Sequence, residues 1–183
     1  MKRFFPQFFG LLVIVLLASC SSPLHWSKDR PLTWDDFKGS EYGHTRDAST
    51  NWTVRYRYQL QGVENNRRYV RFTIYAGINP GESWVSPLHK GSETLLKHEQ
   101  LHFDIAELFA RKVYAALNTK IYSANYRREI KETADALFKE LNETQAAYDE
   151  QTDHSLNTQM QAKWEAAVSD DLKNAPPYPA SIR

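Results

Sequence analysis

The sequence predicts an α+β domain in which a small antiparallel sheet precedes a helical half. Residues 51–60 and 68–78 alternate apolar and polar side chains, which is the period of two expected of half-buried strands. From Ser92 onwards the apolar side chains recur every three or four residues, which is the period of an amphipathic helix. This change of period divides the chain into a β part and an α part.

The two predicted strands are separated by a turn at residues 62–67, and we expect them to form an antiparallel hairpin. A short third strand is predicted at residues 83–85. Before the hairpin, residues 31–39 form an aromatic segment. Because Trp and Phe mostly bury apolar area, we expect Trp34 and Phe37 to pack in the core.

Three helices are predicted in the second half of the chain. The first begins after Ser92, which is a suitable N-cap, and continues without Gly or Pro to Asn118. The second covers residues 126–148, and the third covers residues 156–172. Long helices joined by a short connection usually pack antiparallel, so the end of the second helix is expected to return towards the beginning of the first.

The first twenty residues have the pattern of an export signal. Lys2 and Arg3 precede an apolar run at residues 8–18, which is shorter than the roughly 20 residues needed to cross a bilayer core. The run ends in Leu-Ala-Ser-Cys, where the cysteine is Cys20. This ending resembles the lipobox of bacterial lipoproteins, in which the chain is cut before the cysteine and the cysteine is acylated. The resemblance implies a lipid-anchored protein of the cell envelope, and Ser21 implies the outer membrane, facing the periplasm, in a Gram-negative cell.

These patterns divide the chain into a signal peptide at 1–19, a tether at 20–30, one domain at 31–175 and an extended tail at 176–183. The chain has 23 Lys and Arg against 22 Asp and Glu and no long run of one sign, so we expect no nucleic-acid partner. A single cysteine excludes a disulfide scaffold. With 13% aromatic residues the chain is not a disordered polymer, and we expect a monomeric globular domain.

The first predicted helix contains the motif H-E-x-x-H at residues 98–102. Each helical residue turns by about 100°, so His98 and His102 lie on one face, one turn apart. Their imidazoles can therefore converge on one metal ion. Glu99 lies beside them, where a carboxylate can reach a water molecule at the metal and act as a general base. The motif predicts a zinc hydrolase site.

Catalytic zinc takes three protein ligands and leaves a further position open, so a third ligand is needed. Asp104 and Glu107 are near in sequence, but they point about 120° and 180° away from His98 on the helical wheel. We expect these two acids to serve packing or ion pairing instead, as between Glu107 and Arg111 at i+4.

The third ligand is expected at the end of the second helix, which returns towards the motif. We favour His154, which lies just past that end. Glu143 and Asp149 remain alternatives with suitable oxygen ligands, and His89, which precedes the motif, is a weaker one.

The chain resembles the DUF922 family of secreted or lipid-anchored bacterial proteins with a zincin-type motif. The resemblance rests on several segments that span most of the chain after the signal: residues 32–39, 83–85 and 98–107, together with Tyr148, Asp149, Thr152, His154, Gln161 and Trp164. It implies a zincin-like fold and a zinc-dependent, peptidase-like activity. It also supports His98, Glu99 and His102 as site residues, and His154 as the third ligand.

The expected function is that of a membrane-anchored zinc metallohydrolase acting on peptide bonds. His98, His102 and His154 would hold Zn²⁺, and Glu99 would be the general base. The expected partners are a peptide or protein substrate in the envelope and the membrane, through lipidated Cys20. The alternatives are a zinc-binding lipoprotein without catalysis and a structural envelope lipoprotein.

Overall fold

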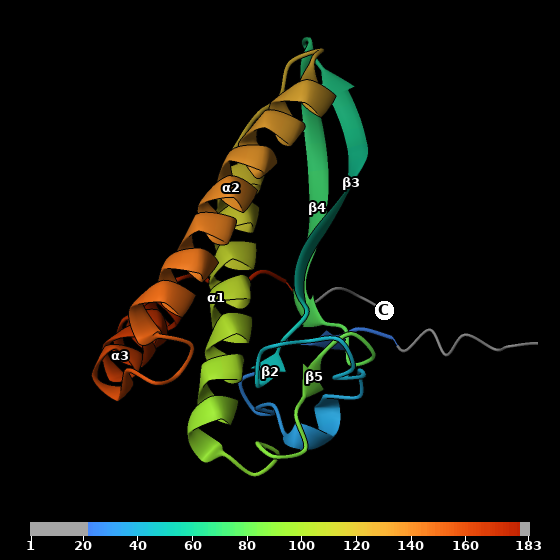
Figure 1. Ribbon diagram of the computed structural model, residues 1–183. Coiled ribbons are helices and arrows are strands. Elements are labelled where there is room, and N and C mark those ends of the chain that lie inside the picture. Colours follow the sequence, from blue (N-terminus) through green and yellow to red (C-terminus); the bar gives the residue numbers. More distant parts are fainter. Residues whose placement is uncertain (1–21, 180–183) are drawn as a thin grey trace, which may run out of the picture.

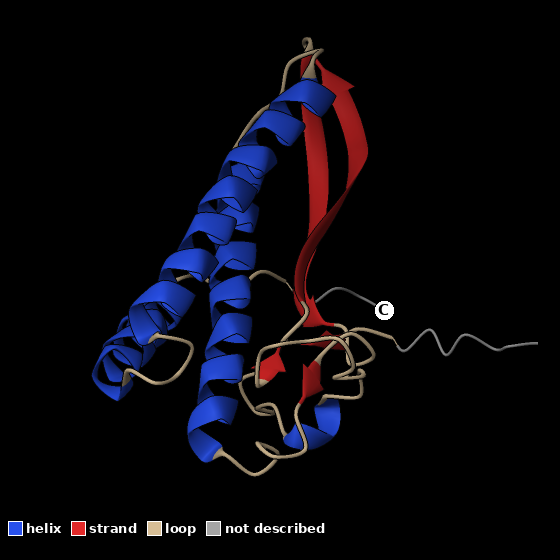
Figure 2. Ribbon diagram, viewed as in Figure 1, coloured by secondary structure: helices blue, strands red, loops and turns tan. Residues whose placement is uncertain are grey.

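The computed structural model describes residues 22–179 (Figure 1). The predicted signal peptide at 1–19, the predicted lipid attachment at Cys20 and the last four residues of the tail lie outside this range. Within it, the fold is α+β, as predicted, with two small antiparallel sheets and three helices (Figure 2). No helix in residues 22–179 is both long and apolar enough to cross a bilayer.

A long two-stranded ribbon forms most of the larger sheet. It consists of β3 (Trp52–Glu64) and β4 (Arg67–Ile78), which pair antiparallel along their whole lengths, with a bulge between Leu60 and Gly62. A short strand, β1 (Leu24–His25), adds to the free edge of β4 at its C-terminal end, giving the order β1-β4-β3. The predicted hairpin is confirmed, and each of its strands is longer than the sequence pattern indicated.

The smaller sheet pairs β2 (Ala48–Ser49) with β5 (Trp84–Val85). The predicted short strand at 83–85 therefore exists, but its partner is a segment for which the sequence pattern predicted no strand. A 3-10 turn, Trp34–Asp36, precedes this sheet, and Phe37 is buried beside it as expected.

Three helices follow: α1 (Glu93–Asn118), α2 (Tyr126–Thr152) and α3 (Thr158–Asn174). The Ser92 hydroxyl accepts a hydrogen bond from the amide of Leu95, so the predicted N-cap of α1 is confirmed. Helix α1 is the central element, because it packs on the ribbon through one face and on α2 and α3 through others (Figure 1).

Helix α1 is buried on both sides, which explains its unusually wide apolar surface. One core lies between α1 and the inner face of the ribbon and includes Phe72, Ile74 and Phe103. A second core lies between α1, α2 and α3 and includes Phe109 and Tyr148. The motif at residues 98–102 therefore lies on a helix whose position is fixed by two cores.

The described parts of the predicted tether and tail contact the domain. Leu24 and His25 pair with β4, and the indole nitrogen of Trp26 donates to Oδ1 of Asp104 at 2.7 Å. The hydroxyl of Tyr178, in the tail, donates to Oε2 of Glu107 at 2.7 Å. Residues 22–30 and 176–179 are thus packed on the domain, because aromatic side chains and buried carboxylates on α1 give them specific partners.

Candidate metal centre

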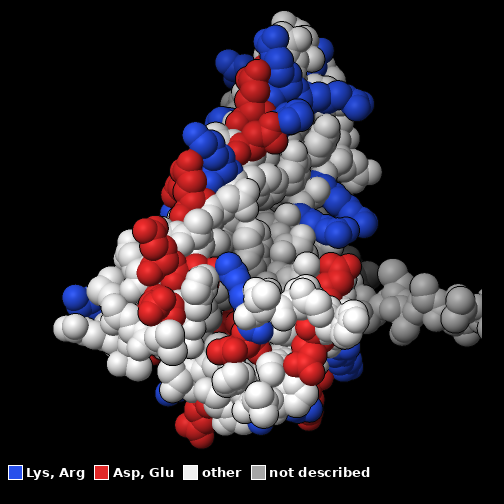
Figure 3. Space-filling view, viewed as in Figure 1, with Lys and Arg blue, Asp and Glu red and all other residues white. Residues whose placement is uncertain are grey.

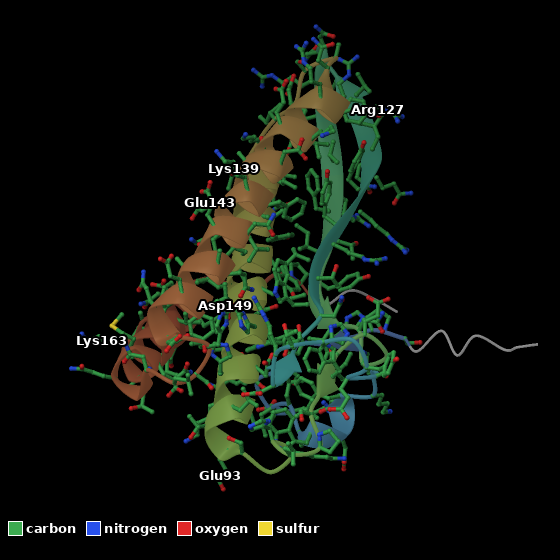
Figure 4. The ribbon with its side chains drawn as sticks, in the orientation of Figure 1. Glu93, Arg127, Lys139, Glu143, Asp149 and Lys163 are labelled. Atoms are coloured by element: carbon green, nitrogen blue, oxygen red, sulfur yellow. The ribbon has the colours of Figure 1, made fainter. Side chains whose placement is uncertain are left out.

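His98 and His102 of α1 meet Asp149 of α2 in the space between the two helices. The two Nε2 atoms lie 3.2 Å apart, and Oδ1 of Asp149 lies 3.2 Å from Nε2 of His98 and 3.0 Å from Nε2 of His102. Both histidines are buried, and the Asp149 side chain is 18% exposed. Figure 4 shows Asp149 on α2 beside α1. Within the described residues, these three form a group able to hold a metal ion.

The antiparallel packing of α1 and α2 produces this convergence. His98 faces Asp149, while His102, one turn further along α1, faces Gln145, one turn earlier along α2. Gln145 and Asp149 therefore lie on one face of α2, as His98 and His102 do on α1. The expectation that the end of the second helix returns to the motif is confirmed.

The partners of the other ring nitrogens define the tautomers of the histidines. Nδ1 of His102 lies 2.6 Å from Oε1 of Gln145, whose amide nitrogen donates to the His102 carbonyl at 2.9 Å. Nδ1 of His98 lies 3.3 Å from Oε1 of Gln161, an oxygen that also accepts from the Tyr148 hydroxyl at 2.7 Å. Because both amide oxygens are acceptors, each Nδ1 carries the hydrogen. The Nε2 atoms of both histidines then carry lone pairs, which point towards the space between the two rings and Oδ1 of Asp149.

This arrangement fits a bound cation. Two imidazole lone pairs and a carboxylate oxygen face one another at about 3 Å, with no donor hydrogen of their own between them. Ligands held about 2.0 Å from a tetrahedral ion lie roughly 3.3 Å apart, close to these separations. Hydrogen-bonded Nδ1 atoms are also the usual support of metal-binding histidines. The chemistry of the donor set therefore suits Zn²⁺.

The ionisation of the group follows the same pattern. Burial works to raise the pKa of Asp149, but contacts with His102 and His98 outweigh it and hold that pKa well below its usual range. Burial works to lower the pKa of His102, but Asp149 and Glu99 outweigh it and the pKa is raised. The site thus attracts positive charge, which either a proton or a metal ion can supply.

Glu99 contacts the segment before β3. The hydroxyl of Thr50 donates to Oε2 of Glu99 at 2.6 Å, and both residues are buried. A cavity of about 430 Å³ opens beside them; it is lined by residues 45–50 and by His98, Glu99, His102 and Asp149 among others. The predicted base and the three possible ligands therefore share one cavity.

Arg46 lies at the mouth of this cavity. Its guanidinium donates to Oδ2 of Asp149 at 3.3 Å, while Oδ1 of the same carboxylate faces the histidines. Asp149 is thus held from both sides, in the position that a ligand oxygen needs.

The structure places His154, the favoured third ligand, at the rim of the group. Its side chain is 52% exposed, and its Nδ1 lies 3.4 Å from Oδ1 of Asp149. The backbone of Asp153, His154 and Ser155 has positive φ angles of 47°, 50° and 85°, which turns the chain away from α2. Ligation by His154 stays a prediction, while Asp149, one of the two alternatives, occupies the central position.

The other candidate acids lie elsewhere. Glu143 is exposed on α2, 3.6 Å from Lys139, and Figure 4 labels both on that helix. Glu107 is buried and pairs with Arg111 at 2.8 Å, as the i+4 spacing predicted. Burial raises the pKa of Asp104, which accepts hydrogen bonds from Trp26 and Gln100. None of the three acids belongs to the group formed by His98, His102 and Asp149.

Sequence reasoning assigned no part in the site to four residues: Arg46, Thr50, Gln145 and Gln161. Gln145 could have been found, because it lies four residues before Asp149 and so shares its face of α2. Thr50 and Gln161 come from outside the two motif helices, and no local pattern marks them.

Comparison with known families gives one match, over residues 82–155, to a family described as "Bacterial protein of unknown function (DUF922)". Residues 82–155 are therefore similar to DUF922. The match covers β5, α1 and α2, and so includes His98, Glu99, His102, Asp149 and His154. Thr50 and Gln161 lie outside it. Searches of curated proteins and of solved structures found no match.

Proposed function

We propose that the protein is a zinc-dependent hydrolase of zincin type that cleaves peptide bonds. The observation that carries the proposal is the convergence of His98, His102 and Asp149, with both Nε2 lone pairs turned inwards. Because Glu99 lines the same cavity, we propose catalysis in addition to metal binding. The similarity of residues 82–155 to DUF922 is compatible with this function but does not define it.

Asp149 is proposed as the third ligand in place of His154. It is the more buried of the two side chains, and its Oδ1 is as close to both histidines as they are to each other. A bound Zn²⁺ supplies a Lewis acid that polarises a carbonyl group and acidifies water. Arg46 and Gln145 keep the ligands oriented, through Oδ2 of Asp149 and Nδ1 of His102 respectively.

Glu99 is the general base in this proposal. Thr50 occupies its Oε2, so Oε1 is the oxygen left to take a proton from the attacking water. The same oxygen then returns the proton to the leaving amine, which is the role of a carboxylate that serves as base and acid in turn. The bond between the carbonyl carbon and the amide nitrogen breaks, and water supplies the new oxygen and both protons.

Metal analysis tests the ligand set. Purified wild type is expected to bind one equivalent of zinc, while His102→Ala and Asp149→Ala are expected to lose it. His154→Ala should retain zinc, and Glu143→Gln is a matched control on the surface of α2. Zinc loss in His154→Ala with retention in Asp149→Ala would reverse the assignment of the third ligand.

The catalytic step needs a separate experiment. Glu99→Gln is expected to keep one equivalent of zinc and to lose cleavage of a peptide library that wild type cleaves. If wild type binds zinc but cleaves nothing in the library, the protein is a zinc-binding module. If Glu99→Gln cleaves as fast as wild type, Glu99 is not the base.

We also propose that the protein is held in the bacterial cell envelope by lipid on Cys20. The support is the sequence pattern at residues 1–20, with its short apolar run and the Leu-Ala-Ser-Cys ending. Cells grown with labelled palmitate should label the wild type and leave Cys20→Ser unlabelled. Equal labelling of the two proteins would contradict the proposal.

A further inference from the structure

The β3–β4 ribbon carries an unusual concentration of positive charge. Residues 55–71 contain five arginines and a single acid, Glu64, although the chain as a whole is close to neutral. Figure 3 shows basic side chains gathered over the β3–β4 turn and the start of α2, and others along the ribbon. The rest of the chain is therefore slightly acidic, and the charge of the molecule is polarised towards this hairpin.

Four of these arginines share the face of the ribbon that is turned away from the helices. Phe72 and Ile74 of β4 are buried against α1, and alternation along the strand places their sequence neighbours on the opposite side. The strand register then defines this outer face by its side chains: Arg55, Arg57, Gln59 and Glu64 of β3, and Arg67, Tyr69, Arg71, Thr73 and Tyr75 of β4. Among the described elements, β1 contacts this face through His25, whose ring is stacked on Tyr75.

The outer-face arginines have no partner within the described chain. Arg55, Arg57, Arg67 and Arg71 make no ion pair, side-chain hydrogen bond or ring contact with residues 22–179. Arg57 pairs with Thr73 and Arg71 pairs with Gln59, so these two arginines are diagonal neighbours, roughly 7 Å apart at the backbone. Like charges at this spacing are unfavourable for the sheet, and an anionic ligand would relieve the repulsion.

Protection of the strand edges from aggregation does not account for this pattern. Charges of either sign would protect an edge, and a mixture would avoid repulsion. The outer face instead has four arginines against one acid, Glu64, and the arginines are interleaved with the rings of Tyr69 and Tyr75. Tyr69 is 42% exposed, and Tyr75 is stacked on His25 at 4.5 Å, which holds its ring in place.

The shape and chemistry of the outer face indicate the class of ligand. From Arg67 to Tyr75 the face is about 27 Å long, while two strands are only about 5 Å apart, so it matches a linear chain. It carries no aliphatic side chain, whereas the exposed Leu60 lies on the other face, so insertion into a bilayer is not favoured. Guanidinium groups bind carboxylates through paired hydrogen bonds, and tyrosine rings present flat apolar faces to sugar rings.

We propose that the outer face of the β3–β4 ribbon binds a linear acidic glycan. The guanidinium groups of Arg55, Arg57, Arg67 and Arg71 contact its carboxylates, and the rings of Tyr69 and Tyr75 pack against its sugars. The export pattern of residues 1–20 favours a glycan over a nucleic acid, because it places the mature chain outside the cytoplasm. This surface is distinct from the metal centre and does not depend on its function.

The test is titration calorimetry of the purified protein at one fixed, low ionic strength. The probes are polygalacturonate, neutral dextran, a single-stranded oligonucleotide and vesicles containing phosphatidylglycerol. Polygalacturonate is expected to bind and dextran is not. Tighter binding to the oligonucleotide or to the vesicles than to polygalacturonate would overturn the choice of a glycan.

Paired variants test the location of the binding surface. Arg57→Gln/Arg71→Gln is expected to weaken polygalacturonate binding at least about tenfold, because two charge-assisted contacts are lost. Lys139→Gln/Lys163→Gln removes the same charge from α2 and α3 and is expected to stay within about twofold of wild type. Unchanged binding in the arginine pair, or equal losses in both pairs, would overturn the proposal. Circular dichroism shows whether each variant is folded.

Discussion

The hydroxyl of Thr50 lies 2.6 Å from Oε2 of Glu99, and the two residues are 49 positions apart in the chain. Both are buried at the wall of the cavity that contains the candidate metal centre. A carboxylate held by one oxygen has one oxygen left for chemistry, and its orientation is set before a substrate arrives. The proposed base is therefore positioned by a residue outside the helix that carries the motif.

Thr50→Val is expected to lower the turnover of a cleaved peptide by roughly tenfold, because the mutation removes a hydrogen bond to a charged group and frees Glu99 to rotate. Thr50→Ser keeps the hydroxyl and should retain most of the activity. Zinc content should be unchanged in both variants, since Thr50 contacts none of the three proposed ligands. A Thr50→Val protein as active as wild type would show that Glu99 does not need this contact.

Zinc is expected to stabilise the fold. An ion that binds only the folded state, at a free concentration 100 times its Kd, adds about 2.7 kcal/mol, which for a domain of this size raises Tm by roughly 5 to 10 °C. Thermal unfolding with zinc and with a chelator measures the difference. In Asp149→Ala the two Tm values should coincide, and a persistent zinc effect there would place the ion elsewhere.

The Arg30–Asp36 pair predicts a specific acid sensitivity. Burial works to raise the pKa of Asp36, but hydrogen bonds from Arg30 and Thr33 outweigh it and lower that pKa. A carboxyl group with a lowered pKa stabilises the fold above its unfolded pKa, and this contribution disappears as the pH falls through its folded pKa. Asp36→Asn is therefore expected to cost about 1 to 2 kcal/mol at pH 7 and progressively less below about pH 4.

Urea unfolding of wild type and Asp36→Asn at several pH values measures this difference. Asp35→Asn is the matched control, because the Asp35 side chain is 92% exposed and lies 3.9 Å from Lys90. A cost of Asp36→Asn that did not change with pH would mean that the charge of Asp36 contributes nothing.

The buried pair of Glu107 and Arg111 predicts non-additive mutations. Their side chains are 4% and 11% exposed, so Arg111→Met leaves a buried carboxylate without its cation and should cost about 3 kcal/mol or more at pH 7. The double variant Glu107→Gln/Arg111→Met should lose less than the single Arg111→Met. Chemical unfolding of the three proteins gives the coupling, and simple additivity would contradict the prediction.

The same pair also predicts a pH dependence, and here the carboxyl pKa is shifted in the opposite direction to that of Asp36. Burial raises the pKa of Glu107, although Arg111 and Tyr178 work against it. Removing Arg111 should raise this pKa further, so protonation at lower pH should relieve the penalty. The cost of Arg111→Met is therefore expected to shrink between pH 7 and pH 5, and a constant cost would mean that Glu107 does not titrate there.

The parts of the fold that local patterns determine could be predicted from the sequence. The ribbon and α1 follow from side-chain periodicity, because each buries one regular face over many residues. The approach of α2 to the motif follows from two long helices and a short connection. The alternation did not reveal β2, whose two residues are defined by pairing with the backbones of Trp84 and Val85 in β5. A two-residue strand has too few positions to show a period.

For the site, His98, Glu99 and His102 have a fixed spacing on one helix, and that spacing can be read directly. The third position depends on the angle and register between α1 and α2 and on the backbone after Thr152. Three successive left-handed residues carry His154 to the rim and leave Asp149 facing the histidines. Such a turn in residues without glycine has no sequence signature, so the sequence alone could not decide between His154 and the alternatives Asp149 and Glu143.

Different elements of the fold contribute different residues to the candidate site. The three proposed ligands come from α1 and α2, whereas Thr50 and Arg46 come from the segment that enters the ribbon. Of these two residues, Arg46 contacts the proposed ligand Asp149, whereas Thr50 contacts only the proposed base Glu99. In evolutionary terms, position 50 is therefore free to diverge without altering the proposed ion site, whereas position 46 is tied to it.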